Sequence, residues 1–330
     1  MRHGMVYEMK ALKITGIVVG VAIVVLAGGL TAAKIVMGAT YFNGYDPKAP
    51  LDAKETDIQE RPGYIRTEFY YNGYMNQRVP GLLATPKAGK GPWPCIIFLH
   101  GIGQQKGFLD EIAEPFVRAG FAFVSFDQLM RGERRLKNAS PLEEAKAFIR
   151  RPAFTVNDTR RLIDYLQTRP DIFPNRIYLT GASYGAITGS TVAAFDKRIP
   201  AVSLCYGGGN IPEMLEARMV AGEIRKYVPM WFAKAVAWYL LSPADPVNYI
   251  ARISPRPIFF QNGTDDGLIS AGAAKAFHQA AKEPKIVKYY EGDHIGMDHD
   301  TVVKVLDDIL AFIQEQDAKA VGSPAHASAS

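Results

Sequence analysis

A buried strand that ends in a serine flanked by glycines constrains the fold of this chain more than any other feature. The segment 176–190, RIYLTGASYGAITGS, starts with branched apolar residues and then places Gly181 and Gly185 two positions before and after Ser183. Where a strand turns directly into a helix, the two backbones cross so closely that side chains at both glycine positions would collide. The sequence therefore predicts a sharp strand-to-helix turn, with a positive φ at Ser183 and its hydroxyl held clear of the sheet.

Strand-like and helix-like segments alternate around this turn. After an expected antiparallel pair at 64–71 and 78–86, strand-like runs occupy 94–101, 121–127, 176–181, 201–207, 257–263 and 285–292. Helical patterns lie near 108–118, 155–168, 184–195 and 270–282, and from about 299, with apolar spacing at Val302, Leu306, Ile309 and Ile313. The alternation predicts an α/β fold, a mostly parallel sheet of about eight strands with helices on both faces. Ligands of such sheets bind at the carboxyl ends of the strands.

Chemically useful side chains follow two later strands at that same edge. Asp265 and Asp266 come directly after the strand-like run 257–263, and His294 follows the last one. A serine hydroxyl is a weak nucleophile at neutral pH, so it needs a base, which in turn needs an orienting acid. Ser183, one of the two aspartates and His294 are therefore the candidate catalytic residues.

The order of motifs resembles the α/β-hydrolase superfamily over roughly residues 61–316. The motifs are HGIG at 100–103, FDQLMRGER at 126–134, GASYG at 181–185, NGTDDGLI at 262–269 and GDH at 292–294. They are most similar to the acetyl-esterase, dienelactone-hydrolase and prolyl-oligopeptidase-like group. The resemblance implies a serine hydrolase that cleaves carboxylic esters through an acyl-enzyme, with a prolyl-oligopeptidase-like peptidase or a catalytically silent binding module as alternatives.

The resemblance also implies particular site residues. In the group's G-x-x-D-x-x-V pattern the acid stands three residues after the glycine, which favours Asp266 over Asp265. The oxyanion hole would use the backbone amides of Tyr184 and Ile102. His100 would support the loop rather than act as the base.

Two further segments have more than one interpretation. Arg131 and Glu133 of the RGER segment either line the pocket or form an ion pair. The interval 210–248 leaves the strand–helix rhythm and is rich in large apolar residues, so we expect a small helical cap, with extra core as the alternative. The cap residues Met230, Trp231, Phe232 and Trp238 favour a small ester substrate with an apolar or aromatic portion.

The N-terminal part predicts a membrane anchor. Residues 14–33 contain no charge, and 20 helical residues span about 30 Å, the thickness of the hydrocarbon core. Basic residues dominate 1–13, which places this end in the cytoplasm and exports the rest. A secretory signal cleaved near AGG or TAA is the alternative, giving a secreted or periplasmic protein. We expect a linker at 34–60, a catalytic domain at 61–317 and a disordered tail at 318–330.

Composition excludes little else. The net charge of +5 comes with no basic stripe interleaved with aromatic residues, so no nucleic-acid partner is expected. The segment DHIGMDHD contains His294 and His299, but their spacing is not that of a helical zinc site. Asp298 and Asp300 instead suit a helix N-terminus. We expect no metal and no cofactor, and the sequence does not predict an oligomeric state.

Overall fold

The computed structural model describes residue 25 and the ranges 27–296 and 298–322, in two units, Met1–Asn43 and Gly44–Ser330. In the first unit residues 27–40 are helical, and the Thr31 hydroxyl donates to the Ala27 carbonyl. Most of the predicted anchor, residues 14–24 and 26, lies outside the described residues. Of the helices that are described, none has the length and apolar character needed to cross a bilayer.

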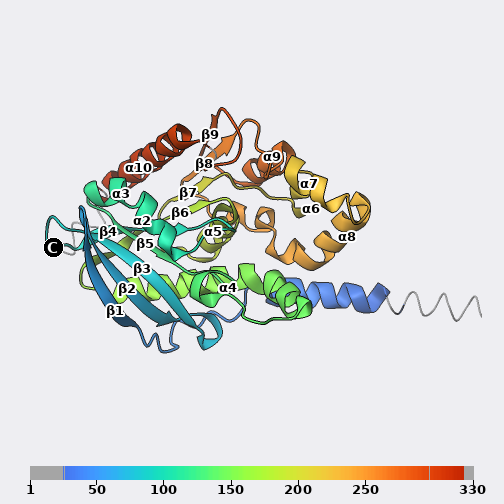
Figure 1. Cartoon of the computed structure of the whole chain (residues 1–330), viewed down its shortest axis with the longest axis horizontal. Coiled ribbons are helices and arrows are strands. Elements are labelled where there is room, and N and C mark those ends of the chain that lie inside the picture. The colour runs from blue at the N-terminus through green and yellow to red at the C-terminus, as the bar shows by residue number, and fades with distance from the viewer. Residues whose placement is uncertain (1–24, 26, 297, 323–330) are drawn as a thin grey trace, which may run out of the picture. The chain divides into compact units, whose positions relative to one another are not determined.

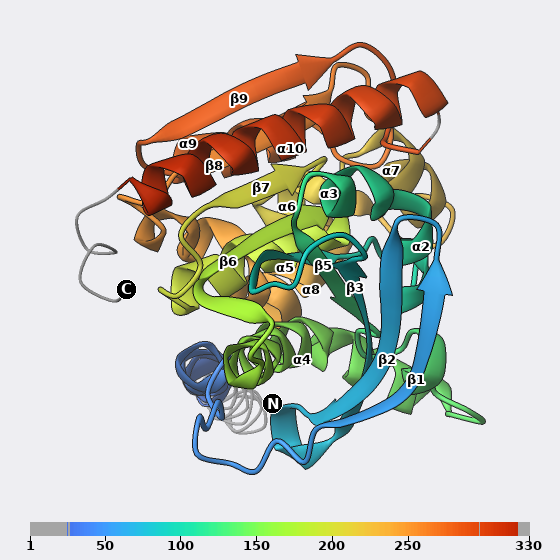
Figure 2. The same cartoon turned by 90° about the vertical axis from the view of Figure 1, so that its left-hand side faces the viewer.

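In the described part of the second unit, nine strands form one mixed sheet. From edge to edge they are β1 (Lys54–Arg61), β2 (Tyr64–Asn72), β3 (Arg78–Pro86), β5 (Ala122–Phe126), β4 (Trp93–Leu99), β6 (Ile172–Ala182), β7 (Val202–Cys205), β8 (Ile258–Gly263) and β9 (Lys285–Tyr290). The pairs from β1 to β5 are antiparallel, and those from β5 through β4 to β9 are parallel. Figure 2 shows the strong twist of this sheet. The predicted mostly parallel sheet is confirmed.

Helices cover both faces of the sheet, as predicted. On one face lie α2 (Leu109–Ile112), α3 (Glu114–Arg118) and α10 (His299–Val321); on the other lie α4 (Pro141–Thr168), α5 (Tyr184–Phe195) and α9 (Ala271–Ala280) (Figure 1). Adjacent residues of β8 show this directly. Phe259 packs on Phe312 of α10, whereas Phe260 packs on Phe277 of α9. Successive strand side chains point to opposite faces, so a central strand buried on both sides is apolar throughout.

Strand β1 lies inside the segment expected to be a linker, 34–60. It pairs only with β2, and nearly all of its residues are exposed. An edge strand that buries neither face carries no apolar alternation, so the pattern that revealed the other eight strands is missing here. The linker prediction is wrong for residues 54–60.

Helix boundaries also differ from the predictions. Helix α4 starts at Pro141 rather than near 155, because Ser140 and Glu143 form a capping box and the helix continues through Pro152. Residues 108–118 form two short helices, α2 and α3, instead of one. Helix α10 extends to Val321, so the predicted tail at 318–330 starts too early.

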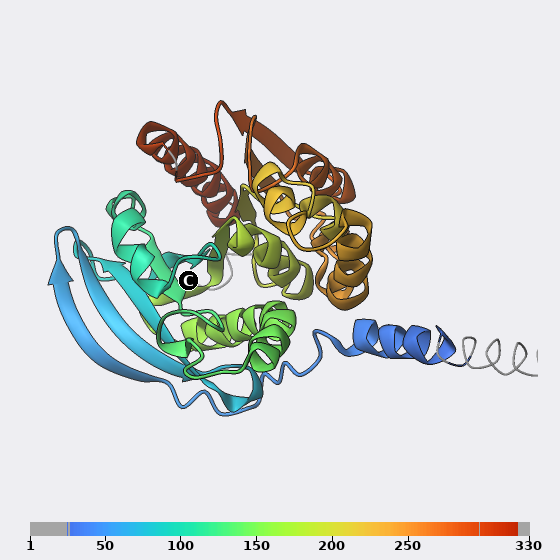
Figure 3. The same ribbon diagram turned by 45° about the vertical axis from the view of Figure 1, so that its right-hand side comes forward.

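The interval 210–248 contains three α-helices between β7 and β8. They are α6 (Ile211–Met214), α7 (Arg218–Ile224) and α8 (Met230–Leu241). Figure 3 shows them in yellow and gold, next to the part of the chain that carries β8 and β9. The amide of Met219 in α7 donates to the Gly267 carbonyl at 2.9 Å, which ties this insertion to the loop after β8.

Candidate active site

The turn between β6 and α5 has the backbone conformation that the glycines predict. Ser183 adopts φ 54° and ψ −118°. A Cβ atom on Gly181 would lie 2.2 Å from the Gly185 carbonyl oxygen, and one on Gly185 would lie 1.8 Å from the Leu99 carbonyl oxygen. Neither position admits any side chain. The crossing of β4, β6 and α5 therefore requires both glycines and holds Ser183 in a region of φ and ψ that non-glycine residues rarely adopt.

The loops after β8 and β9 bring an aspartate and a histidine together. Asp266 Oδ2 lies 2.8 Å from His294 Nδ1, and both side chains are buried. The other carboxylate oxygen of Asp266 accepts hydrogen bonds from the amides of Leu268 and Ile269, at 2.8 and 2.9 Å. An ionised carboxylate only accepts hydrogen bonds, so such a partner selects the tautomer of a neutral imidazole with the proton on Nδ1 and with Nε2 as an acceptor.

Asp265, the alternative acid, points elsewhere. Its side chain is 76% exposed and lies 3.4 Å from Arg218 of α7. Asp293, which the sequence analysis did not single out, links the two loops instead. One of its oxygens accepts from the amides of Gly267 and His294, both at 2.7 Å. These hydrogen bonds lower the pKa of Asp293. Its position immediately before His294 is the sequence feature that could have identified Asp293 as part of the site.

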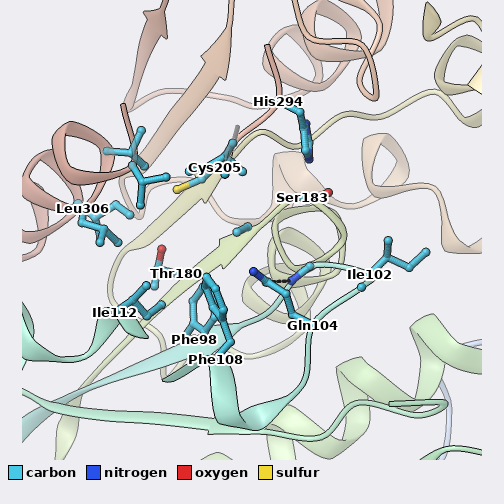
Figure 4. A pocket seen from close by; sticks show the side chains of 18 of the residues that line it. Phe98, Ile102, Gln104, Phe108, Ile112, Thr180, Ser183, Cys205, His294 and Leu306 are labelled. Carbon is cyan, nitrogen blue, oxygen red and sulfur yellow. Dashed lines mark hydrogen bonds between the residues drawn. The ribbon is translucent and has the colours of Figure 1, made fainter. Parts of the chain in front are cut away.

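Ser183 and His294 line one apolar cavity of about 350 Å³ (Figure 4). The recorded hydrogen bond of the His294 ring goes to Asp266, and within the described part of the chain none joins the ring to the Ser183 hydroxyl. The Tyr206 ring meets the imidazole edge-on, with centroids 5.6 Å apart. Burial raises the pKa of Tyr206 to about 12, so this neighbour is uncharged near neutral pH.

The loop after β4 is held by its own polar groups. The Gly101 carbonyl oxygen lies 2.8 Å from His100 Nδ1 and accepts from the Gln104 amide at 3.2 Å. The Gln104 side chain accepts from the Gly101 amide at 2.9 Å, the dashed line in Figure 4. In a trans peptide the N–H points away from the C=O, so these bonds fix the direction of the Ile102 N–H. Burial lowers the pKa of His100 to about 4, which keeps the ring neutral.

The RGER segment ties neighbouring loops together. Arg131 Nε donates to the Ile102 carbonyl, and Glu133 forms an ion pair with Lys106 and accepts from the Tyr70 hydroxyl at 2.9 Å. For Glu133 the ion-pair interpretation therefore holds, with Lys106 as the partner. Arg131 instead fixes the loop that carries Ile102.

A family model for acetyl xylan esterase (AXE1) matches residues 42–207, half of the chain, which includes β1 to β7 and the Ser183 turn. The chain belongs to the acetyl xylan esterase family. The matched region starts before residue 61, where the sequence analysis placed the start of the catalytic domain.

Individual relatives of this family member have sequence identities of about 17–31% to it. It is 26% identical to the putative hydrolase YtaP of Bacillus subtilis over 48% of this chain and 58% of that protein, and 22% identical to the esterase YjfP of Escherichia coli over 62% and 82%. The chain spans about half the length of the first curated relatives it matches. An acetyl xylan esterase from Paenibacillus sp. R4 has a TM-score of 0.69 at 18% identity, over 84% of this chain and 94% of its own. That likeness shows the fold, which is the α/β-hydrolase fold.

In this member of the acetyl xylan esterase family, the aromatic residues of the insertion lie largely in solvent. Trp231, Phe232 and Trp238 of α8 are 72%, 47% and 52% exposed. An open groove of about 730 Å³ separates α8 from α4, with Phe232 and Phe148 among its walls. The apolar surface of the insertion is thus distinct from the cavity that Ser183 and His294 line.

The DHIGMDHD segment leads into α10. Asp298 caps that helix by accepting from the Thr301 amide at 2.8 Å, and Asp300 lies in its first turn, as their residue types predict. Counting only the described residues, no three His, Cys, Asp or Glu side chains are grouped so that they could bind a metal ion.

Proposed function

We propose that this protein is a serine hydrolase that cleaves carboxylic esters through an acyl-enzyme. One observation carries the proposal: His294, paired with the buried Asp266, lines the same cavity as a serine held at positive φ in a strand-to-helix turn. Membership of the acetyl xylan esterase family supports the same reaction class. In this proposal Ser183 is the nucleophile, His294 the base and Asp266 the orienting acid.

The chemistry follows from the proton positions. His294 Nε2 removes the proton of the Ser183 hydroxyl as the oxygen attacks the ester carbonyl carbon. The tetrahedral intermediate collapses, the C–O bond to the alcohol breaks, and the imidazolium returns its proton to the departing alkoxide. Water, deprotonated by the same nitrogen, then attacks the acyl carbon. The C–O bond to Ser183 breaks, the imidazolium returns its proton to the serine oxygen, and the carboxylic acid is released. Asp266 keeps the ring in the required tautomer and stabilises its charged form.

The negative oxygen of the intermediate needs two preorganised N–H donors. We assign the amide of Tyr184, the first residue of α5, and that of Ile102. The bonds from His100 and Gln104 to the Gly101 carbonyl support this assignment, because they set the direction of the Ile102 N–H before substrate arrives. A donor already oriented loses no free energy to rearrangement in the transition state.

The nucleophile is tested by covalent labelling. Wild-type protein should react with a fluorophosphonate probe and hydrolyse p-nitrophenyl acetate, and Ser183→Ala should abolish the labelling. Ser190→Ala is a matched control, because that hydroxyl lies in the same helix and donates to the Ile187 carbonyl. Labelling that survives Ser183→Ala would reject the assignment. Folded wild-type protein that shows neither labelling nor turnover would favour a silent binding module.

We also propose that residues 14–33 anchor the protein in a membrane with the hydrolase domain outside the cytoplasm. The support is the uncharged stretch in the sequence and the excess of basic residues before it. The full-length chain should partition with membranes, and protease added outside spheroplasts should degrade the hydrolase domain. A mature form that starts near residue 30 to 40 would show a cleaved signal instead.

A further inference from the structure

The cavity beside Ser183 extends into the interior of the protein. It runs between the sheet and the helices α2, α3 and α10, and in Figure 4 Ile112 and Leu306 lie on the side away from Ser183. Its apolar walls include Phe98, Phe108, Ile112, Val305, Leu306 and Ile309. Phe98, Val305 and Ile309 are at most 5% exposed, so these walls belong to the protein interior.

The size of the cavity does not match an acetyl group. A water-sized group takes about 30 Å³, and an apolar cavity of about 150 Å³ already accommodates benzene. The cavity here is about 350 Å³. A chain of roughly six to ten carbons is therefore of the right size, whereas a methyl group would leave most of the space unfilled.

The two parts of an ester place different demands on such a space. The alcohol must leave after the first step, and the interior end of the cavity offers it mainly apolar side chains, with the Thr180 hydroxyl as a polar exception. The acyl chain stays bonded to Ser183 until water arrives, so it can occupy an interior site throughout. Gly101 and Ile102, which border the proposed oxyanion hole, also border the cavity, which places the carbonyl at its mouth.

We propose that this cavity binds the acyl chain of medium-chain esters, and that the protein hydrolyses these esters faster than acetates. The inference rests on the proposed serine esterase activity and adds the class of acid that the substrate carries. The chain leaves water for a mainly apolar site, which lowers the barrier only as long as further carbons fit.

The first experiment compares acyl chains on one leaving group. With full-length protein in detergent, kcat/KM is measured for p-nitrophenyl acetate, butyrate, octanoate and dodecanoate. We expect up to about fourfold gain per added methylene, an overall gain of at least about tenfold from acetate to octanoate, and a decline at dodecanoate. A second series, ethyl against hexyl acetate, should show no comparable gain from a longer alcohol.

Substitutions in the cavity test its location. Leu306→Trp should lower the octanoate-to-acetate ratio of kcat/KM by about tenfold or more, because the indole fills the space that the chain needs. Ile112→Ala enlarges the cavity and should move the optimum toward longer chains, which keeps the test informative if the larger side chain impairs folding. Val236→Trp, in the groove between α8 and α4, is the matched control and should leave the ratio unchanged.

The possible outcomes separate this inference from the proposed function. Wild-type protein that labels with fluorophosphonate but prefers acetate, or gains from a longer alcohol instead, overturns the acyl-chain assignment and leaves the esterase proposal standing. The same holds if Leu306→Trp and Val236→Trp change the ratio equally. If the protein hydrolyses no ester and does not react with the probe, both the acyl-chain assignment and the esterase proposal are overturned.

Discussion

Two buried pairs of charged or titratable side chains in this protein have similar geometry and different surroundings. In the loops after β8 and β9, Asp266 lies 2.8 Å from His294, with side chains 4% and 7% exposed. Between α4 and the segment after β5, Asp158 lies 2.7 Å from Arg134, with side chains 0% and 6% exposed. Distance and burial alone do not separate the two pairs.

The remaining hydrogen bonds of the two pairs distinguish them. Asp158 also accepts from the Tyr74 amide at 2.6 Å, and Arg134 donates to the Asp127 carbonyl and the Gln77 side chain, both at 3.2 Å. Burial raises the pKa of Asp158 even though Arg134 opposes that shift. This network closes on protein groups, whereas His294 keeps one ring nitrogen on the edge of a cavity. In the proposed mechanism the first pair moves a proton, whereas the second pair holds the β2–β3 turn against α4.

The largest expected effect comes from the pair at the cavity. Asp266→Asn should lower kcat for a p-nitrophenyl ester by about 10⁴-fold, because the amide no longer selects the reactive tautomer of His294. Asp265→Asn is the control: its exposed side chain contacts Arg218, so kcat should change less than about threefold. Equal losses in the two variants would contradict the assignment of the acid.

The second prediction concerns the Asp158–Arg134 pair. Arg134→Met should lower the free energy of unfolding by about 3–5 kcal/mol, because it leaves the Asp158 carboxylate buried without its partner. Urea unfolding measures this loss, and kcat per folded molecule should stay near the wild-type value. Arg118→Met breaks the exposed pair with Glu114 and should change stability little. A loss of activity without a loss of stability in Arg134→Met would reverse the contrast.

The two pairs also differ in how far the sequence predicts them. The glycines around Ser183 required one backbone geometry, and the strand ends put His294 and two neighbouring aspartates at one edge. The choice of Asp266 came from the resemblance to the G-x-x-D-x-x-V pattern. Asp158 lies inside the helix predicted near 155–168, but it meets Arg134 through the packing of α4 against the segment after β5. Long-range contacts of that kind depend on packing, which no local pattern encodes.

Helix α10, which borders the cavity, shows the same limit of prediction from sequence. The apolar spacing of α10 predicts one face against the sheet, and Ile309 and Ile313 are indeed buried there. Of this face, Val302, Leu306 and Ile309 line the cavity, whereas Ile313 does not. Periodicity identifies the face of a helix. The space left between that face and α2 depends on where a second element, distant in the sequence, comes to lie.

The smallest expected effect is on the pH dependence of the free energy of unfolding, and it involves a histidine outside the cavity. His278 lies in the interior, 2.9 Å from the Asn262 side chain, and burial lowers its pKa from 6.5 to about 4. His100 has the same shift for the same reason. Below pH 6.5 the unfolded chain binds protons that the folded protein does not, so the free energy of unfolding should fall as the pH is lowered toward 4.

Each of these two histidines should contribute about 2 kcal/mol of that loss between pH 7 and pH 5. Urea unfolding at several pH values measures it, and His278→Gln should remove about half of the combined contribution whatever its effect on stability at pH 7. An unchanged slope in that variant would mean that His278 takes up a proton in the folded protein. Burial at His278 would then not prevent protonation, and the contrast between the protein interior and the cavity beside His294 would not hold.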